Sequence, residues 1–120
     1  MRKIEFYKMH GLGNDFVIID RRKNFIKINK NIVKKLSNRK TGPGCDQVIT
    51  IDKSKNSNHD VSIQIHNSNG DIAEACGNGT RCVAKLVFQQ TKLNKIKIKS
   101  LAGTLTAKKI NKNMISVNLG

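Results

Sequence analysis

The sequence predicts one α+β domain whose curved, largely antiparallel sheet carries two helices. Isoleucine and valine dominate the aliphatic residues, while aromatic residues make up only 4% of the chain, and β-branched residues favour strands. Several segments alternate apolar and polar residues, as half-buried strands do, and two others place apolar residues at helical spacing. A chain of 120 residues has room for a single core, so we expect one domain over 1–120.

The chain is expected to begin with two strands joined by a loop. Alternating residues predict a strand over Lys3–Met9, a loop follows over His10–Asp15, and Phe16–Asp20 forms a short buried strand. The two glycines of this loop do not make a dinucleotide-binding motif, which needs a third glycine and a helix behind it. We therefore expect no nucleotide site here.

A first helix and a pinned loop come next. Either Asn29 or Asn31 can cap the helix, whose apolar residues recur at helical spacing until it ends near Lys40. The loop Thr41–Gln47 has one glycine on each side of the only proline in the chain. This composition predicts a bend of fixed shape.

Most of the other regular structure is strand. We expect strands over Gln47–Ile51 and over the alternating segments Asp60–His66 and Lys95–Ser100. A closing hairpin is expected from Thr104–Ile110 and Met114–Leu119. With a second helix before the last three strands, the predicted order is ββαββαβββ.

The segment 67–86 combines a turn, a short extended run, a cysteine, a glycine-rich bend and a helix. Asn69–Gly70 is a strong tight-turn dipeptide. Gly77–Gly79 allows a sharp bend, and the helix is expected from about Thr80. Cys76 would then lie beside the free N–H groups of a helix start, which attract anions and favour a thiolate. The alternative is an inert, buried cysteine.

The charge balance points to no particular polyanion. The formal net charge is +15, from 23 basic and 8 acidic residues, but the lysines are scattered along the chain. No basic helix and no pair of sheet aromatics for base stacking is present, so nucleic-acid binding is not expected as the main function. Without a membrane-length apolar run or a secretion leader, we expect a soluble cytoplasmic protein without membrane contact.

The three cysteines are Cys45, Cys76 and Cys82. An odd number without a secretion signal favours reduced thiols over a disulfide framework. The spacing of the last two matches no common zinc motif, and no pair of histidines supplies further ligands. We therefore predict no metal site.

Three loops taken together resemble the diaminopimelate epimerase family. They are HGLGNDF at 10–16, GPGCDQ at 42–47 and NSNGDIAEACGNGTRC at 67–82, and the likeness runs from the first strand to the last residue. The resemblance implies a barrel-like curved sheet wrapped around a central helix. In the family, two such pseudo-symmetric halves enclose the active site, and this chain is similar to the amino-terminal half.

The resemblance also implies a cofactor-independent isomerase that converts LL- to meso-diaminopimelate on the route to lysine. In the family, one cysteine thiolate removes the α-proton and a second cysteine thiol returns a proton from the opposite side. Cys76 matches the first-half catalytic cysteine, while Gly77 and Asn78 match contacts to the substrate α-carboxylate. Three further positions match polar contacts that hold the substrate: Asn14, Gln47 and Asn67.

The sequence departs from the family pattern at its end. The family's second cysteine, its adjacent Glu-Arg pair and its returning final strand come later than Gly120, where this sequence stops. Cys45 and Cys82 are not expected to substitute, because Cys82 lies on the apolar face of its helix. We therefore expect the chain alone to be inactive or incomplete, with a second half or another copy of the chain as its partner.

Two alternatives remain open at the level of sequence. The chain could belong to another two-cysteine amino-acid racemase or epimerase on the same fold. It could also be a non-catalytic basic binding module from a truncated gene, which would bind RNA in a salt-sensitive way.

Overall fold

The computed structural model describes residues 3–118. Its helices are α1 (Lys30–Ser37) and α2 (Gly77–Gln90). Its strands are β1 (Tyr7–Gly11), β2 (Asn14–Asp20), β3 (Gln47–Lys53), β4 (Val61–Asn67), β5 (Ile72–Ala73), β6 (Lys95–Ser100), β7 (Gly103–Asn111) and β8 (Met114–Asn118).

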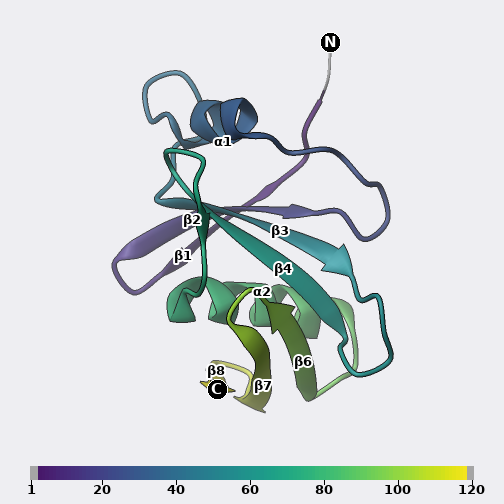
Figure 1. Ribbon diagram of the computed structural model, residues 1–120. Coiled ribbons are helices and arrows are strands. Elements are labelled where there is room, and N and C mark those ends of the chain that lie inside the picture. The colour runs from purple at the N-terminus through teal and green to yellow at the C-terminus, as the bar shows by residue number, and fades with distance from the viewer. Residues whose placement is uncertain (1–2, 119–120) are drawn as a thin grey trace.

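One curled, mixed sheet contains all the strands, in the order β1-β2-β3-β4-β6-β7-β8 with β5 beside β4. The β2–β3 and β4–β6 pairs are parallel, and the other pairs are antiparallel. The sheet curves around α2, whereas α1 lies on the other side of it (Figure 1). The predicted α+β class, with a barrel-like sheet around a central helix, is therefore confirmed.

The sheet has an apolar core on each face. Phe16 and Ile18 of β2 join the larger core, which α2 covers. Val17 and Ile19 of the same strand pack in a second core with residues of α1, such as Val33. β2 is buried on both faces, and its sequence is accordingly a continuous run of apolar residues over 16–19.

The predicted first strand, Lys3–Met9, and the predicted loop His10–Asp15 are both wrong in their bounds. β1 begins at Tyr7 and continues to Gly11, and β2 already begins at Asn14. A two-residue turn joins them, with Gly13 at a φ of 79°, and Gly11 pairs with Asn14. The tight turn sets the register of the hairpin. The residues at both ends of the predicted loop therefore belong to the two strands.

Of the two candidate caps, Asn29 is the one that caps α1, since its Oδ1 accepts the N–H of Ile32 at 2.9 Å. The helix ends at Ser37 and not near Lys40 as expected. The side chain of Asn38 accepts the N–H of Lys40 at 2.8 Å, so it stabilises a turn in place of another helical turn.

The remaining strands lie close to their predicted bounds, and the short extended run before Cys76 becomes the two-residue strand β5. β8 follows the described chain to Asn118, whereas its expected last residue, Leu119, lies outside the described residues. No helix in residues 3–118 is long and apolar enough to span a membrane.

The two edges of the sheet, β1 and β8, both contact α2. A groove of about 880 Å³ runs between them over the helix. Its lining includes Met9 of β1, Cys82 of α2 and Ile115 of β8. The curled sheet is therefore open along one seam.

Candidate active site

Three of the predicted substrate contacts lie at one end of the sheet. Asn14 opens β2, Gln47 opens β3, and Asn67 ends β4. Because β2 and β3 are parallel and β3 and β4 antiparallel, these ends coincide, and Gln47 pairs directly with Asn67. The Nε2 of Gln47 donates to Oδ1 of Asn67 at 3.0 Å, so strand topology places the two amides in contact.

Cys76 is the N-cap of α2. Its Sγ accepts the N–H of Gly79 at 3.4 Å, and its carbonyl oxygen accepts the N–H of Thr80 at 2.9 Å. The helix therefore starts at Gly77, earlier than the predicted start near Thr80. Cysteine is not among the preferred capping residues, which explains the error. This geometry leaves the N–H groups of Gly77 and Asn78 without an acceptor inside the helix.

Asn78 connects the start of α2 to the β1–β2 hairpin. Its Nδ2 donates to the carbonyl oxygen of Leu12 at 2.9 Å and to Oδ1 of Asn14 at 3.1 Å. The approach is close, because a Cβ added to Gly11 would lie 2.8 Å from the Cβ of Asn78. Gly11 therefore belongs to the site by packing, a role that its sequence context alone does not reveal.

The helix start also lies directly against the same end of the sheet. A Cβ added to Gly79 would lie 2.6 Å from Cδ1 of Ile49, 3.2 Å from Cε1 of Phe16 and 3.5 Å from Sγ of Cys76. Ile49 follows closely on Gln47 in β3, and Phe16 follows closely on Asn14 in β2. The structure thus gathers all six predicted residues around one end of the sheet and the start of α2.

The three cysteines are free thiols in different surroundings. Cys76 is half-buried, whereas Cys82 lies in the larger core and Cys45 in the core under α1. Burial raises the pKa of the Cys45 thiol and of the Cys82 thiol. Cys82 is therefore a core residue, as its place on the apolar helix face predicts, and both buried thiols are poor candidates for proton transfer.

Sequence reasoning missed a charged cluster beside these residues. Asp15 directly follows Asn14, and Asp46 directly precedes Gln47. Arg39 forms ion pairs with both carboxylates. The one signal in the sequence is that each acidic residue is adjacent to a predicted contact. Within residues 3–118, no three histidine, cysteine or acidic side chains are grouped so as to hold a metal ion.

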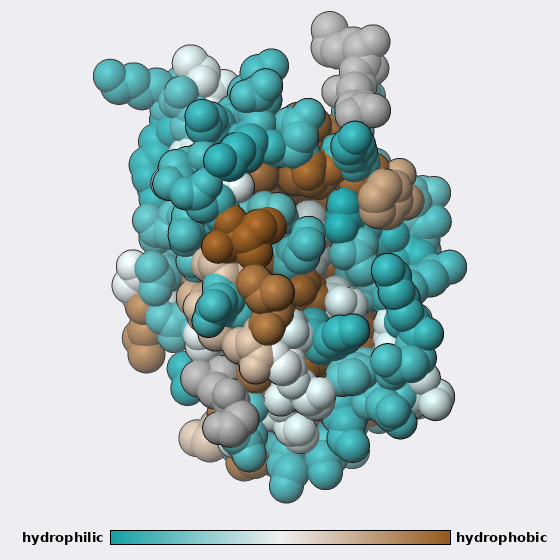
Figure 2. Space-filling view, in the orientation of Figure 1, coloured by the Kyte–Doolittle hydropathy of each residue, from teal (hydrophilic) through white to brown (hydrophobic). Residues whose placement is uncertain are grey.

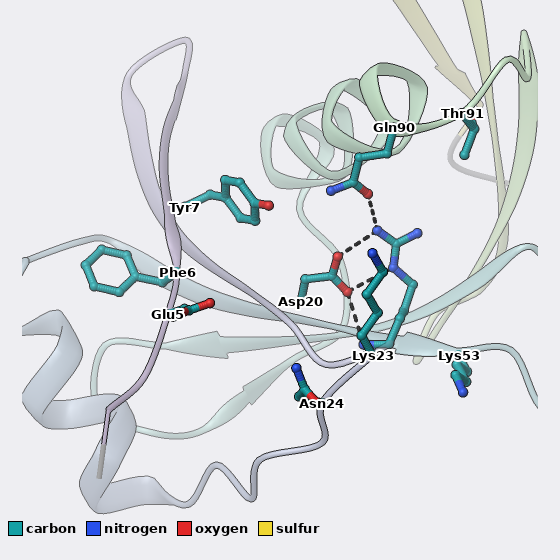
Figure 3. A pocket seen from close by; sticks show the side chains of 10 residues that line it. Glu5, Phe6, Tyr7, Asp20, Lys23, Asn24, Lys53, Gln90 and Thr91 are labelled. Carbon is teal, nitrogen blue, oxygen red and sulfur yellow. Dashed lines mark hydrogen bonds and ion pairs between the residues drawn. The ribbon is translucent and has the colours of Figure 1, made fainter. Parts of the chain in front are cut away.

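A second hollow, of about 840 Å³, lies at the other end of α2, beside Gln90. The guanidinium of Arg22 pairs with the carboxylate of Asp20 and also donates to Gln90. Figure 3 shows Asp20 and Gln90 in the lining of this hollow. Arg22 lowers the pKa of Asp20, so these two charges of the hollow neutralise each other. A helix of 14 residues spans about 20 Å, and this hollow is therefore separate from Cys76.

Comparison with known sequences gives one consistent family. The sequence profile described as "Diaminopimelate epimerase" matches residues 6–120. Diaminopimelate epimerase of Pelagibacter ubique is 40% identical over 117 residues, which are 98% of this chain and 42% of the relative. The enzyme of that name from Buchnera aphidicola subsp. Acyrthosiphon pisum is 42% identical, with the same coverage. The chain spans less than half the length of both relatives.

Solved structures of lower identity share the fold. A PhzF-family phenazine biosynthesis protein from Bacillus anthracis superposes with a TM-score of 0.71 at 16% identity, covering 98% of this chain and 40% of that one. A hydroxyproline epimerase from Agrobacterium vitis gives 0.68 at 14% identity, over 87% of this chain and 36% of that one. At these identities the likeness shows the fold alone.

Proposed function

Because the chain belongs to the diaminopimelate epimerase family, a family of isomerases, we propose that it supplies one half of an active site for diaminopimelate. The proposed reaction inverts the α-carbon that distinguishes LL- from meso-diaminopimelate, by proton transfer without a cofactor. The observation that carries this proposal is the half-buried thiol of Cys76 at the N-cap of α2.

In this proposal Cys76 is the base. Its thiolate takes the α-proton and becomes a thiol, which leaves the electron pair on the α-carbon as a carbanion. The sulfur of Cys76 accepts the N–H of Gly79 at 3.4 Å, so a donor of the helix start already faces the sulfur. Thiols suit both proton removal and proton return, because their pKa lies near the working pH.

The start of α2 is proposed to hold the substrate α-carboxylate. The backbone N–H groups of Gly77 and Asn78 have no acceptor within the helix, and anions bind at such places. Donors fixed by the fold also stabilise charge that develops on the carboxylate as the proton leaves. Support for this role comes from the adjacency of both residues to Cys76, within the same helical turn.

The three amides at the sheet end are proposed to orient the substrate. Hydrogen bonds between side-chain amides fix the orientation of Gln47 on Asn67 and of Asn14 on Asn78. An amide held in this way presents its remaining donors and acceptors in a set direction. Such preorganisation would align the α-carbon with the thiolate. Alignment of the reacting groups can account for a large part of an enzyme's rate enhancement.

Inversion needs a second group on the opposite side of the α-carbon. We propose that a second half, covalently continuous or separate, supplies a thiol that donates its proton to the carbanion and becomes a thiolate. The groove between β1 and β8 is a suitable place for an extended strand of that half, because both flanking strands are sheet edges. Closing the site would also exclude water from the carbanion.

Deuterium exchange tests the proposal directly. The purified chain is incubated with LL-diaminopimelate in deuterated buffer, alone and with a second-half fragment of a relative, and both isotope content and configuration are followed. We expect slow exchange with retained configuration for the chain alone, and inversion only when the second half is added. Cys76→Ser should abolish both.

The matched control is Cys45→Ala, which removes a buried thiol from the other core and should leave the reaction intact. Complete epimerisation by a strictly monomeric chain would contradict the need for a second half. Unchanged exchange in Cys76→Ser would contradict the role of this cysteine.

A further inference from the structure

The starts of β2 and β3 are tied together by two acidic residues. The N–H of Asp46 donates to Oδ1 of Asp15 at 2.9 Å and to its carbonyl oxygen at 3.1 Å. In return, the N–H of Asp15 donates to Oδ2 of Asp46 at 3.1 Å. Each carboxylate thus accepts the backbone N–H of the other residue, which brings two negative charges close together.

Arg39 lies between these carboxylates. Its Nη1 and Nη2 donate to the two oxygens of Asp15, both at 2.8 Å, and Nη2 also donates to Oδ1 of Asp46 at 3.1 Å. The only other cation paired with the two carboxylates in residues 3–118 is Lys8, which contacts Asp15 at 2.8 Å and also donates to the carbonyl oxygen of Gly44. Arg39 is therefore the cation that bridges both acidic residues.

The backbone around this arginine is shaped to receive it. Gly44 has a φ of 73°, and a Cβ added there would lie 2.7 Å from Cγ of Arg39. The hydrogen bonds from Arg39 are the largest influence on the Asp15 carboxyl and hold its pKa well below the ordinary value, against the opposing effect of burial. Asp15 is thus ionised throughout the neutral range, and it needs a partner of opposite charge.

This cluster connects directly to the proposed substrate contacts. The Nδ2 of Asn14 donates to Oδ2 of Asp46 at 3.4 Å, and Oδ1 of Asn14 accepts from Asn78 at 3.1 Å. Asp46 also directly precedes Gln47 at the start of β3. A continuous series of polar contacts therefore runs from Arg39 through Asp46 and Asn14 to the start of α2.

We propose that Arg39 is a positioning residue, which fixes Asn14 and Gln47 relative to Asn78 by joining the carboxylates of Asp15 and Asp46. The proposal rests on the proposed function for the role of these amides. Without the guanidinium, the two carboxylates would lie close together with only Lys8 beside Asp15. Their repulsion would then loosen the arrangement of the starts of β2 and β3. Asp46 contacts Asn14, which in turn contacts Asn78. An unneutralised Asp46 would therefore place a negative charge near the proposed site of the substrate carboxylate.

A lysine cannot take over this role fully. Arginine has a planar, rigid fork that bonds a carboxylate through two parallel N–H groups, whereas lysine is a point charge. Arg39→Lys should therefore restore the charge balance but not the geometry. This difference separates a positioning role from a purely electrostatic one.

The first test follows the side-chain amides by nitrogen-15 NMR in the intact chain. In Arg39→Ala we expect the NH₂ signals of Asn14, Gln47 and Asn78 to shift or broaden, with an intermediate change in Arg39→Lys. The matched control is Arg21→Ala, which removes another two-pronged pair, with Asp52, at 2.8 and 2.7 Å. Asp52 lies near the opposite end of β3, so this variant should leave the three amides unchanged.

Unchanged amide signals in a folded Arg39→Ala chain would overturn the proposal, as would equal changes in the Arg21→Ala control. If Arg39→Ala does not fold, the comparison of Arg39→Lys with the wild type decides the matter in the same way.

The second test measures how meso-diaminopimelate protects Cys76 from iodoacetamide. In Arg39→Ala we expect the half-protecting concentration to rise by about tenfold or more, a loss of the size found when a residue that orients a metal ligand is removed. An unchanged concentration in that variant counts against Arg39. Absence of protection in the wild type counts against the proposed function instead, while the amide signals still decide the role of Arg39.

Discussion

Single residues at the start of α2 differ sharply in their surroundings, and Cys76 is the clearest case. Its sulfur accepts a hydrogen bond from the helix N-terminus, whereas Cys82, six positions later, lies with its side chain in the core at 5% exposure. Accessibility and hydrogen bonding therefore both favour reaction at the first thiol.

We predict that Cys76 is alkylated faster than Cys82 and Cys45 in the folded chain. Burial raises the pKa of both other thiols and hides them from reagents, so their thiolate fraction near neutral pH is small. Mass mapping of iodoacetamide-labelled sites across a range of pH measures the three rates. Faster labelling of Cys82 than of Cys76 would show that the site is assigned to the wrong cysteine.

His66 is a buried residue on β4 whose pairing is incomplete. Its side chain is only 6% exposed, and no hydrogen-bond partner for Nε2 is found among residues 3–118. Burial, and then the charge of Arg21, lower its pKa below the ordinary value of 6.5. The folded chain therefore keeps this imidazole neutral at pH values where the unfolded chain would protonate it.

We predict that His66 makes the chain less stable as the pH falls below about 6.5. In that window the unfolded state binds a proton that the folded state excludes, so stability falls with pH until the folded pKa is reached. His66→Leu should flatten this dependence, by at most about 1.4 kcal/mol per pH unit. Urea unfolding at several pH values measures it, with His10→Leu at an exposed position of β1 as the control. Equal slopes for His66→Leu and wild type would rule out this role.

Among the elements, α2 depends most on close packing, and Gly79 makes that packing possible. The helix lies so near β3 that an added methyl group would meet Cδ1 of Ile49 at 2.6 Å. Ile49 is fully buried, so it has little room to move. The position of Cys76 at the helix start follows from this contact.

We predict that Gly79→Ala destabilises the chain by about 1–3 kcal/mol, the usual cost of overpacking a core. The gain in helix propensity from glycine to alanine, about 1 kcal/mol, offsets part of that cost. Thermal or urea unfolding measures the change, and Gln89→Ala on the exposed face of the same helix should have little effect. A more stable Gly79→Ala chain would contradict the prediction, because it would show that Ile49 can move aside without loss of stability.

For the molecule as a whole, the surface combines a high positive charge with local apolar areas. Figure 2 shows mostly hydrophilic side chains around an apolar area near the middle of the view, over the region of β5 and the β6–β7 turn. A hollow there has Ile72 and Leu101 in its lining, and these side chains are 46% and 67% exposed. Exposed apolar areas of this kind mark contact surfaces.

We predict weak self-association of the chain that increases with salt. The net charge of +15 keeps copies apart at low ionic strength, and salt screens this repulsion. Leu101→Lys should reduce the association, whereas Leu93→Lys, also at an exposed leucine but outside this hollow, should change it less. Sedimentation velocity at several concentrations measures the effect, and a strictly monomeric chain at high salt would contradict the prediction.

Much of the architecture follows from local rules that the sequence expresses directly. Alternation in β4 and β6 sets which side chains face the core. The asparagines before α1 also predict a cap near its start, and the structure selects Asn29 over Asn31. Residue spacing also predicts the body of α2, although not its start at Gly77. These features depend on neighbours a few residues apart, so the order of residues determines them.

The tertiary structure decided which distant residues meet. Gln47 contacts Asn67, Asn14 contacts Asn78, and Arg39 bridges two carboxylates. Strand order and the docking of α2 bring these groups together, and neither leaves a periodic signal in the sequence. Contacts between remote side chains depend on how the sheet curls around its helix, which is why the resemblance of three loops to a family predicted the site residues without predicting how they hold one another.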